Sequence, residues 1–109
     1  MSNKDKIISR VKKMNREMVI VTRHPALDRY LREQFPFLEN APVIPHAGAH
    51  KVAGKVVFGV LPLSLAALAR AVVVIPLDIP FEMRGKELDL ETVREFAGEP
   101  ELYEVERKI

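Results

Sequence analysis

Residues 18–25 of the chain read MVIVTRHP, and this stretch decides the fold. Its first half is short, apolar and β-branched, which is typical of a parallel strand buried on both faces of a sheet. Pro25 suits the first position of a helix, because the N–H that proline lacks would have no partner there. Apolar residues then recur at helical spacing before Pro36, at Leu27, Tyr30, Leu31 and Phe35. We therefore predict a buried strand at 18–21 that runs directly into a helix.

Similar strand and helix patterns follow along the chain. Apolar or half-apolar runs predict four further strands, at 43–44, 56–61, 71–75 and 102–105. Two segments with good helix formers or a capping residue predict helices, at 64–70 and 89–97. Strands that alternate with helices form a parallel sheet with right-handed crossovers. The predicted fold class is α/β: a Rossmann-like parallel sheet flanked by helices, in one small domain over residues 18–109.

The composition limits the class of protein. A length of 109 residues suffices for one core, and 48% hydrophobic with 29% charged residues is typical of a globular protein. The chain has no cysteine, which excludes disulfides and thiolate chemistry. No apolar run approaches the roughly 20 residues that span a bilayer, and the first residues lack the apolar core of a secretory signal. We therefore expect a cytoplasmic protein that does not engage a membrane.

The formal net charge of +2 is unevenly distributed. Residues 1–17 hold six basic and two acidic residues, a net charge of +4, which leaves −2 for residues 18–109. We interpret the basic segment as an N-terminal extension, either an amphipathic helix or a solvated tail docked loosely on the domain. The rest of the chain lacks the broad basic face of proteins that coat long nucleic acid. The expected ligand is therefore a small anion held by a few cations.

The strand ends predict where that ligand binds. Ligands of parallel α/β sheets bind beyond the carboxyl ends of the strands, at a topological switch point. Polar residues that follow the predicted strands should therefore converge at one edge of the sheet. These residues are Thr22, Arg23, His24, the turn at 59–64 with Ser64, Asp78 and, further along, Arg84.

The dipeptide Arg23-His24 offers the most chemistry. A guanidinium can hold a phosphate through two parallel hydrogen bonds, and the helix that opens at Pro25 adds backbone N–H groups aimed at an anion. Alternatively, His24 caps the helix and Arg23 pairs with a nearby carboxylate.

Two later loops carry further candidates. Gly59 permits close approach of a ligand to the backbone, and Ser64 can donate to a phosphate oxygen, although it can equally serve as a helix cap. Arg84 and Lys86 are candidate phosphate ligands, with Glu87 expected to orient Arg84, unless this charged loop is merely solvated.

The histidines of the middle loop do not indicate a metal site. His46 and His50 are four residues apart, but Pro45 and Gly48 argue against a helix between them. Without cysteine or an adjacent pair of carboxylates, we predict no metal site. His46 is instead a candidate proton-transfer group, because imidazole titrates near neutrality, or else a loop histidine that faces water.

Five motifs follow one another along the chain: Thr22-Arg23-His24-Pro25, His46, Gly59-Val60-Leu61-Pro62, Leu77-Asp78-Ile79-Pro80 and Arg84-Gly85-Lys86-Glu87-Leu88. In this order they resemble a small CRISPR-associated ring nuclease family of type III systems. The resemblance covers roughly residues 18–96. Two loops depart from the family pattern: Ala26 follows the first motif where the family often has Gly, and Lys55 stands where it commonly has Asp.

The resemblance implies a Rossmann-like (CARF-like) homodimer that degrades cyclic tetra-adenylate, a messenger made on viral infection. The ribose 2′-hydroxyl of the ring is the nucleophile, so no metal or other cofactor is expected, and the product is a linear oligoadenylate with a 2′,3′-cyclic phosphate. We expect Arg23 and Arg84 to clamp phosphates, and either His24 or His46 to transfer the proton. Alternatively, the protein binds the cyclic oligoadenylate without cutting it, as a sponge or sensor, because related small families do so. The expected ligand-binding residues are Thr22, Gly59, Leu61, Pro62, Ser64, Asp78, Lys86 and Glu87.

Overall fold

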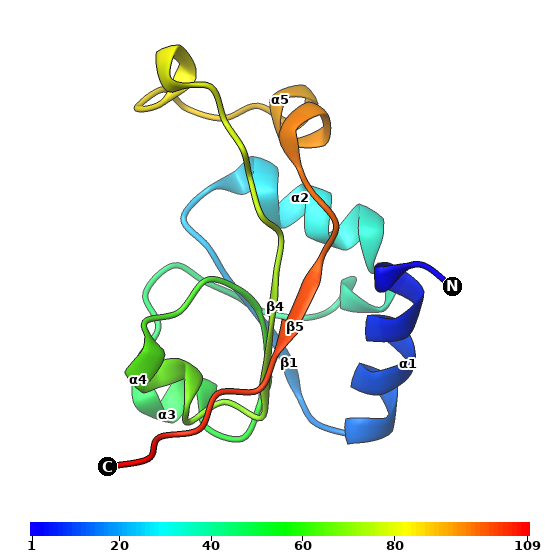
Figure 1. Ribbon diagram of the computed structural model, residues 1–109, viewed down its shortest axis with the longest axis vertical. Helices are drawn as coiled ribbons and strands as arrows, with labels where there is room; N and C mark the ends of the chain where they lie inside the picture. The colour runs from blue at the N-terminus through cyan, green and yellow to red at the C-terminus, as the bar shows by residue number, and fades with distance from the viewer.

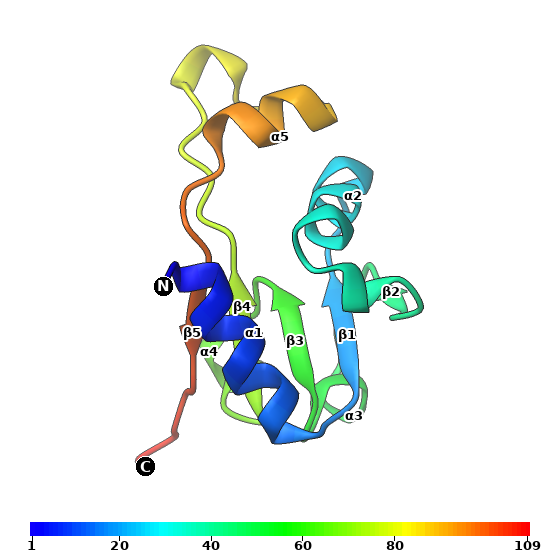
Figure 2. The same ribbon diagram turned by 90° about the vertical axis from the view of Figure 1, so that its right-hand side faces the viewer.

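The computed structural model describes residues 1–109 and shows a five-stranded sheet between two layers of helices (Figure 1, Figure 2). The strands are β1 (Met18–Val21), β2 (Val43–Ile44), β3 (Val56–Gly59), β4 (Ala71–Val74) and β5 (Glu101–Tyr103), and their order in the sheet is β2-β1-β3-β4-β5. The α/β fold predicted from the sequence is confirmed. None of the helices has the length and apolar character needed to cross a membrane.

The strand order places the topological switch point between β1 and β3. From β1 the chain crosses through one helix to β2 on one side, and from β2 it returns to β3 on the other side of β1. Two neighbouring parallel strands whose connections leave in opposite directions open a crevice at their carboxyl ends. In Figure 2 the arrowheads of β1 and β3 point toward this end of the sheet.

The prediction that all strands are parallel is wrong for β5, which pairs antiparallel with β4 through Val73 and Leu102. The reason lies in the preceding segment. After β4 the chain runs beyond the sheet to the last helix and comes straight back, with an antiparallel bridge between Leu77 and Ala97 and a hydrogen bond from the Gly98 N–H to the Pro76 carbonyl. Figure 1 shows the outgoing and returning segments side by side.

Three helices cover one face of the sheet and two short ones cover the other (Figure 1). Helices α1 (Asn3–Met14), α2 (Pro25–Gln34) and α5 (Leu90–Phe96) lie on the first face, and α3 (Ala49–Val52) and α4 (Leu63–Ala66) lie on the second. Two 3₁₀ turns, η1 (Pro36–Leu38) and η2 (Phe81–Met83), complete the elements. Successive strand residues point to opposite faces, so a strand covered on both faces is apolar throughout.

The N-terminal segment belongs to the core. Ser2 caps α1 by accepting a hydrogen bond from the Asp5 N–H at 3.1 Å, and Ile7 and Val11 are buried in the same apolar cluster as Ile20. The interpretation of this segment as a loosely docked solvated tail is therefore wrong, and its helical alternative is correct. Burial of one apolar stripe stabilises such a helix more than its intrinsic propensity does.

Several element boundaries differ from those expected. The strand expected at 56–61 ends at Gly59, because its φ of +144° turns the chain out of the sheet. The loop expected around His50 contains α3, which begins at Ala49, and the helix expected at 64–70 is limited to Leu63–Ala66. The last strand begins one residue earlier than predicted, at Glu101.

Candidate functional site

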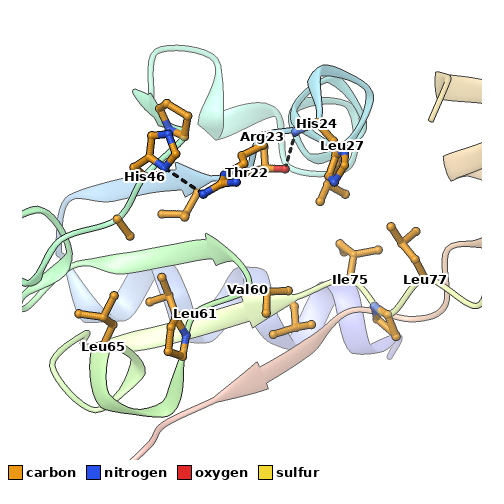
Figure 3. A pocket seen from close by; sticks show the side chains of 16 residues that line it. Thr22, Arg23, His24, Leu27, His46, Val60, Leu61, Leu65, Ile75 and Leu77 are labelled. Atoms are coloured by element: carbon orange, nitrogen blue, oxygen red, sulfur yellow. Dashed lines mark hydrogen bonds between the residues drawn. The ribbon is translucent and has the colours of Figure 1, made fainter. Parts of the chain in front are cut away.

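A cleft of about 660 Å³ opens at the switch point between β1 and β3. Figure 3 shows that polar side chains after β1 form one wall together with His46, while Val60, Leu61 and Ile75 lie on the opposite wall. The lining includes one arginine, two histidines and one threonine, and it contains no carboxylate. Apolar walls with a few cationic or polar groups suit a ligand that combines a flat base with a phosphate.

Arg23 and His46 form the central contact of this cleft. The Arg23 Nη2 lies 3.0 Å from the His46 Nδ1 (Figure 3). A guanidinium is always protonated and can only donate, so the His46 Nδ1 accepts, and the hydrogen of the neutral ring is on Nε2. Both side chains are exposed. The alternative that Arg23 pairs with a carboxylate is wrong, since the structure gives it no such ion pair.

The position of His46 depends on an arginine of α2. Arg32 forms an ion pair with Asp28 at 2.8 Å and donates to the carbonyl oxygens of Leu38, Glu39 and Ala41 at 2.7–2.9 Å. These bonds hold the segment that enters β2, and β2 in turn carries the His46 loop to the edge of β1. The contact between Arg23 and His46 is thus built by packing between elements that are distant in sequence.

Thr22 and His24 shape the entry into α2. The Thr22 Oγ1 accepts a hydrogen bond from the His24 backbone N–H at 3.1 Å, and the His24 carbonyl accepts the first bonds of the helix. His24 occupies the N-cap position, but its imidazole makes no capping bond. The alternative that its side chain caps the helix is therefore wrong. The exposed imidazole has no hydrogen-bond partner within the protein and is available to a ligand.

Gly59 is required by the sheet itself. A Cβ at this position would lie 2.1 Å from the carbonyl oxygen of Val21 in the neighbouring strand. Gly59 therefore permits the close approach of β3 to β1. The approach of the two strands accounts for this glycine without a ligand, which is the reason expected from the sequence. Leu61 and Pro62, which follow Gly59 and Val60 and which we predicted to contact a ligand, line the cleft.

Ser64 and Asp78 lie outside the cleft. Ser64 is exposed in the first turn of α4, whose N-cap is Pro62, and it makes no capping bond, so its alternative role as a cap is wrong. Asp78 is also exposed, and its backbone N–H donates to the Phe96 carbonyl at 3.2 Å. Neither residue lines the 660 Å³ cavity.

The Arg84 loop forms a second cavity of about 500 Å³. The Arg84 Nε donates to the Ile79 carbonyl at 3.2 Å, and the structure contains no ion pair between Arg84 and Glu87. The expectation that Glu87 orients Arg84 is therefore wrong. Arg23 and Arg84 do not share a cavity, and His24 is the one residue that lines both.

Apart from Leu61 and Pro62, the apolar lining of the main cleft was not predicted from the sequence. Leu27, Leu65 and Leu77 line it beside the predicted polar residues. Helical spacing assigned Leu27 to a helix face, and the Ala- and Leu-rich composition of residues 64–70 assigned Leu65 to a buried helix. Only Leu77, one residue before Asp78 and just beyond a strand, carried a local signal. No group of three or more His, Cys, Asp or Glu side chains lies close enough to hold a metal ion.

Comparison with known protein families shows to which family the chain belongs. Residues 19–106 match the model of a family described as "Putative CRISPR-associated protein (Cas_VVA1548)". The chain belongs to this CRISPR-associated family. The matched residues include both cavities and exclude α1. No curated protein and no solved structure matches the chain.

Proposed function

We propose that the protein is a ring nuclease that opens cyclic tetra-adenylate and thereby switches off type III CRISPR signalling. The observation that carries the proposal is the cleft at the switch point, where the guanidinium of Arg23 is held by His46 among side chains without any carboxylate. A guanidinium that has no carboxylate partner and lies at the carboxyl ends of parallel strands favours a phosphate ligand. Membership of a CRISPR-associated family is consistent with this substrate.

The reaction is an internal transesterification. The ribose 2′-oxygen forms a bond to phosphorus, the bond from phosphorus to the 5′-oxygen breaks, and one proton moves from the 2′-hydroxyl to the departing 5′-oxygen. The product is a linear oligoadenylate with a 2′,3′-cyclic phosphate, and no water is consumed. A site that holds the 2′-oxygen in line with the leaving oxygen can lower the barrier by about 7–11 kcal/mol.

Three side chains divide the work. Arg23 binds the scissile phosphate and stabilises the charge that develops on it. His46 positions Arg23 through its Nδ1, and its Nε2–H can donate to a phosphate oxygen. His24 transfers the proton, because its imidazole has no internal partner and lies in the lining of the cleft. The proposal assigns proton transfer to His24, whereas the sequence left the choice between His24 and His46 open.

The active form is proposed to be a two-fold dimer. Val60 and Leu63 are 68% and 75% exposed, and they line an apolar depression together with Tyr103. Val60 also lines the main cleft, so this apolar surface is continuous with the site. A ring of four nucleotides is itself symmetric, and an isologous interface would present two Arg23 side chains to opposite phosphates.

The decisive experiment incubates the protein with labelled cyclic tetra-adenylate in the presence of EDTA. We expect a linear product with a 2′,3′-cyclic phosphate, one ring bound per two chains, and a light-scattering mass twice 12.4 kDa. Tight binding of a ring that stays intact would favour the sponge or sensor. Absence of binding would contradict both the nuclease and the sponge or sensor.

Substitutions of the two histidines test the roles proposed for His24 and His46. His24→Ala should lower kcat by about 10²–10⁴-fold with little change in affinity, since proton transfer acts mainly in the transition state. His46→Ala should weaken affinity and rate together, and His46→Asn should recover part of both, because the Asn oxygen can accept from Arg23. Full activity of His24→Ala would contradict the assignment of the proton-transfer group.

A further inference from the structure

The cavity beside Arg84 is distinct from the cleft that holds Arg23, although His24 lines both. We propose that this second cavity is an adenylate subsite, which binds the nucleotide next to the scissile phosphate and takes no part in bond cleavage. This inference rests on the proposed function, because it assigns a second nucleotide of the same ring to the same subunit.

Position is the first argument. His24 stands at the start of α2 and lines both the 660 Å³ cleft and the 500 Å³ cavity. A cyclic oligoadenylate whose scissile phosphate lies beside His24 in the main cleft is therefore also next to the cavity beside Arg84. A single mononucleotide would leave one of the two cavities empty.

Charge is the second argument. The Arg84 Nε is committed to the Ile79 carbonyl, which orients the guanidinium, while its two terminal nitrogens have no hydrogen-bond partner in the protein. Lys86 lines the same cavity and forms no ion pair. Two exposed cations without carboxylate partners are suited to a second phosphate.

The remaining lining suits an adenine base. Ile79, Met83 and Leu88 are only partly exposed and provide apolar surface for the ring. Glu87 lines the cavity without an ion pair, and an ionised carboxylate can only accept hydrogen bonds. The N6 amino group of adenine is a donor, so Glu87 can accept from it.

The two cavities also account for the number of nucleotides. In the proposed dimer, two subsites per subunit make four, one for each adenylate of the ring. Arg84 then clamps a phosphate in a cavity separate from the cleft that Arg23 lines.

Steady-state kinetics and calorimetry with cyclic tetra-adenylate test this assignment. Arg84→Ala should raise KM and Kd by about tenfold to a hundredfold, the range of a charge-assisted hydrogen bond, with kcat within about twofold of wild type. Lys51→Ala removes the same charge from α3, outside both cavities, and should leave all three values unchanged. A fall in kcat at unchanged KM, or no effect on either, would overturn the subsite.

The outcome is separable from that of the proposed function. If the wild-type protein binds the ring without cutting it, the nuclease proposal fails, yet a weaker Kd for Arg84→Ala still supports the subsite. If the wild type cuts the ring and Arg84→Ala behaves like wild type, only the subsite fails.

Base recognition has its own measurement. The wild type should prefer the adenosine ring over a cyclic tetramer of purine riboside, which lacks the amino group, and Glu87→Ala, which removes the acceptor, should narrow that preference several-fold. A preference that stays unchanged in Glu87→Ala would overturn the contact between Glu87 and the base.

Discussion

Replacement of Gly59 by alanine tests how closely β1 and β3 approach at the switch point. The new Cβ would lie 2.1 Å from the carbonyl oxygen of Val21 and 3.0 Å from its carbonyl carbon. Both atoms belong to the backbone of a buried strand, so no side chain can move to relieve the overlap. The φ of +144° at this position is in addition a conformation that alanine rarely adopts.

The expected loss of stability has two parts. The unfavourable backbone conformation costs about 1–3 kcal/mol. The overlap can be relieved only by separation of the two strands, which brings the total to roughly 3–5 kcal/mol, a large value for one methyl group. For a domain of this size the midpoint of thermal unfolding should fall by about 10 °C or more.

Gly85→Ala is the matched control. Its φ is +82°, and nothing lies within 4 Å of the Cβ that would be added, so it carries the conformational cost without the overlap. We expect a loss of about 1–2 kcal/mol for this variant. Urea unfolding followed by circular dichroism measures both. Equal losses for the two variants would refute the argument, because the contact with Val21 would then contribute nothing.

Two further predictions concern the helices that cover the sheet. Val11 is 0% exposed, so Val11→Ala should lower the free energy of unfolding by about 2 kcal/mol. Lys13→Ala, on the exposed side of α1, should change this free energy by less than about 0.5 kcal/mol. Equal effects of the two substitutions would mean that α1 is not part of the core. A hydrogen bond from Arg94 of α5 holds the pKa of the Glu33 carboxyl in α2 below its usual range. The pair therefore stabilises the fold at any pH above the ordinary pKa of a carboxyl group, and this stabilisation is lost as the pH falls through the lowered pKa. The stability difference between wild type and Glu33→Gln should therefore be present at pH 7 and vanish in acid, and a difference independent of pH in urea titrations would contradict this account.

The amino-acid sequence by itself determined the fold class and the neighbourhood of the site. Uninterrupted apolar runs rich in β-branched residues, such as residues 18–21 and 71–74, have few stable arrangements other than buried parallel strands, because both faces must be covered by helices. Since ligands bind at the carboxyl ends of such strands, Arg23 and His24 were predicted as site residues from their place in the chain alone, and both line the cleft. Leu61 and Pro62 followed from the same rule.

Only the tertiary structure decided which of those residues meet. His46 is 23 positions from Arg23, and their contact depends on the path of β2, which Arg32 holds through bonds to three carbonyl oxygens. Local spacing contains no information about such a path, nor about the turn of the chain that places Arg84 in a cavity of its own. The antiparallel direction of β5 and the burial of Val11 likewise arise from packing between distant segments. The sequence carries the chemical groups, and the distances between them are set by contacts that form only when the whole sheet is covered.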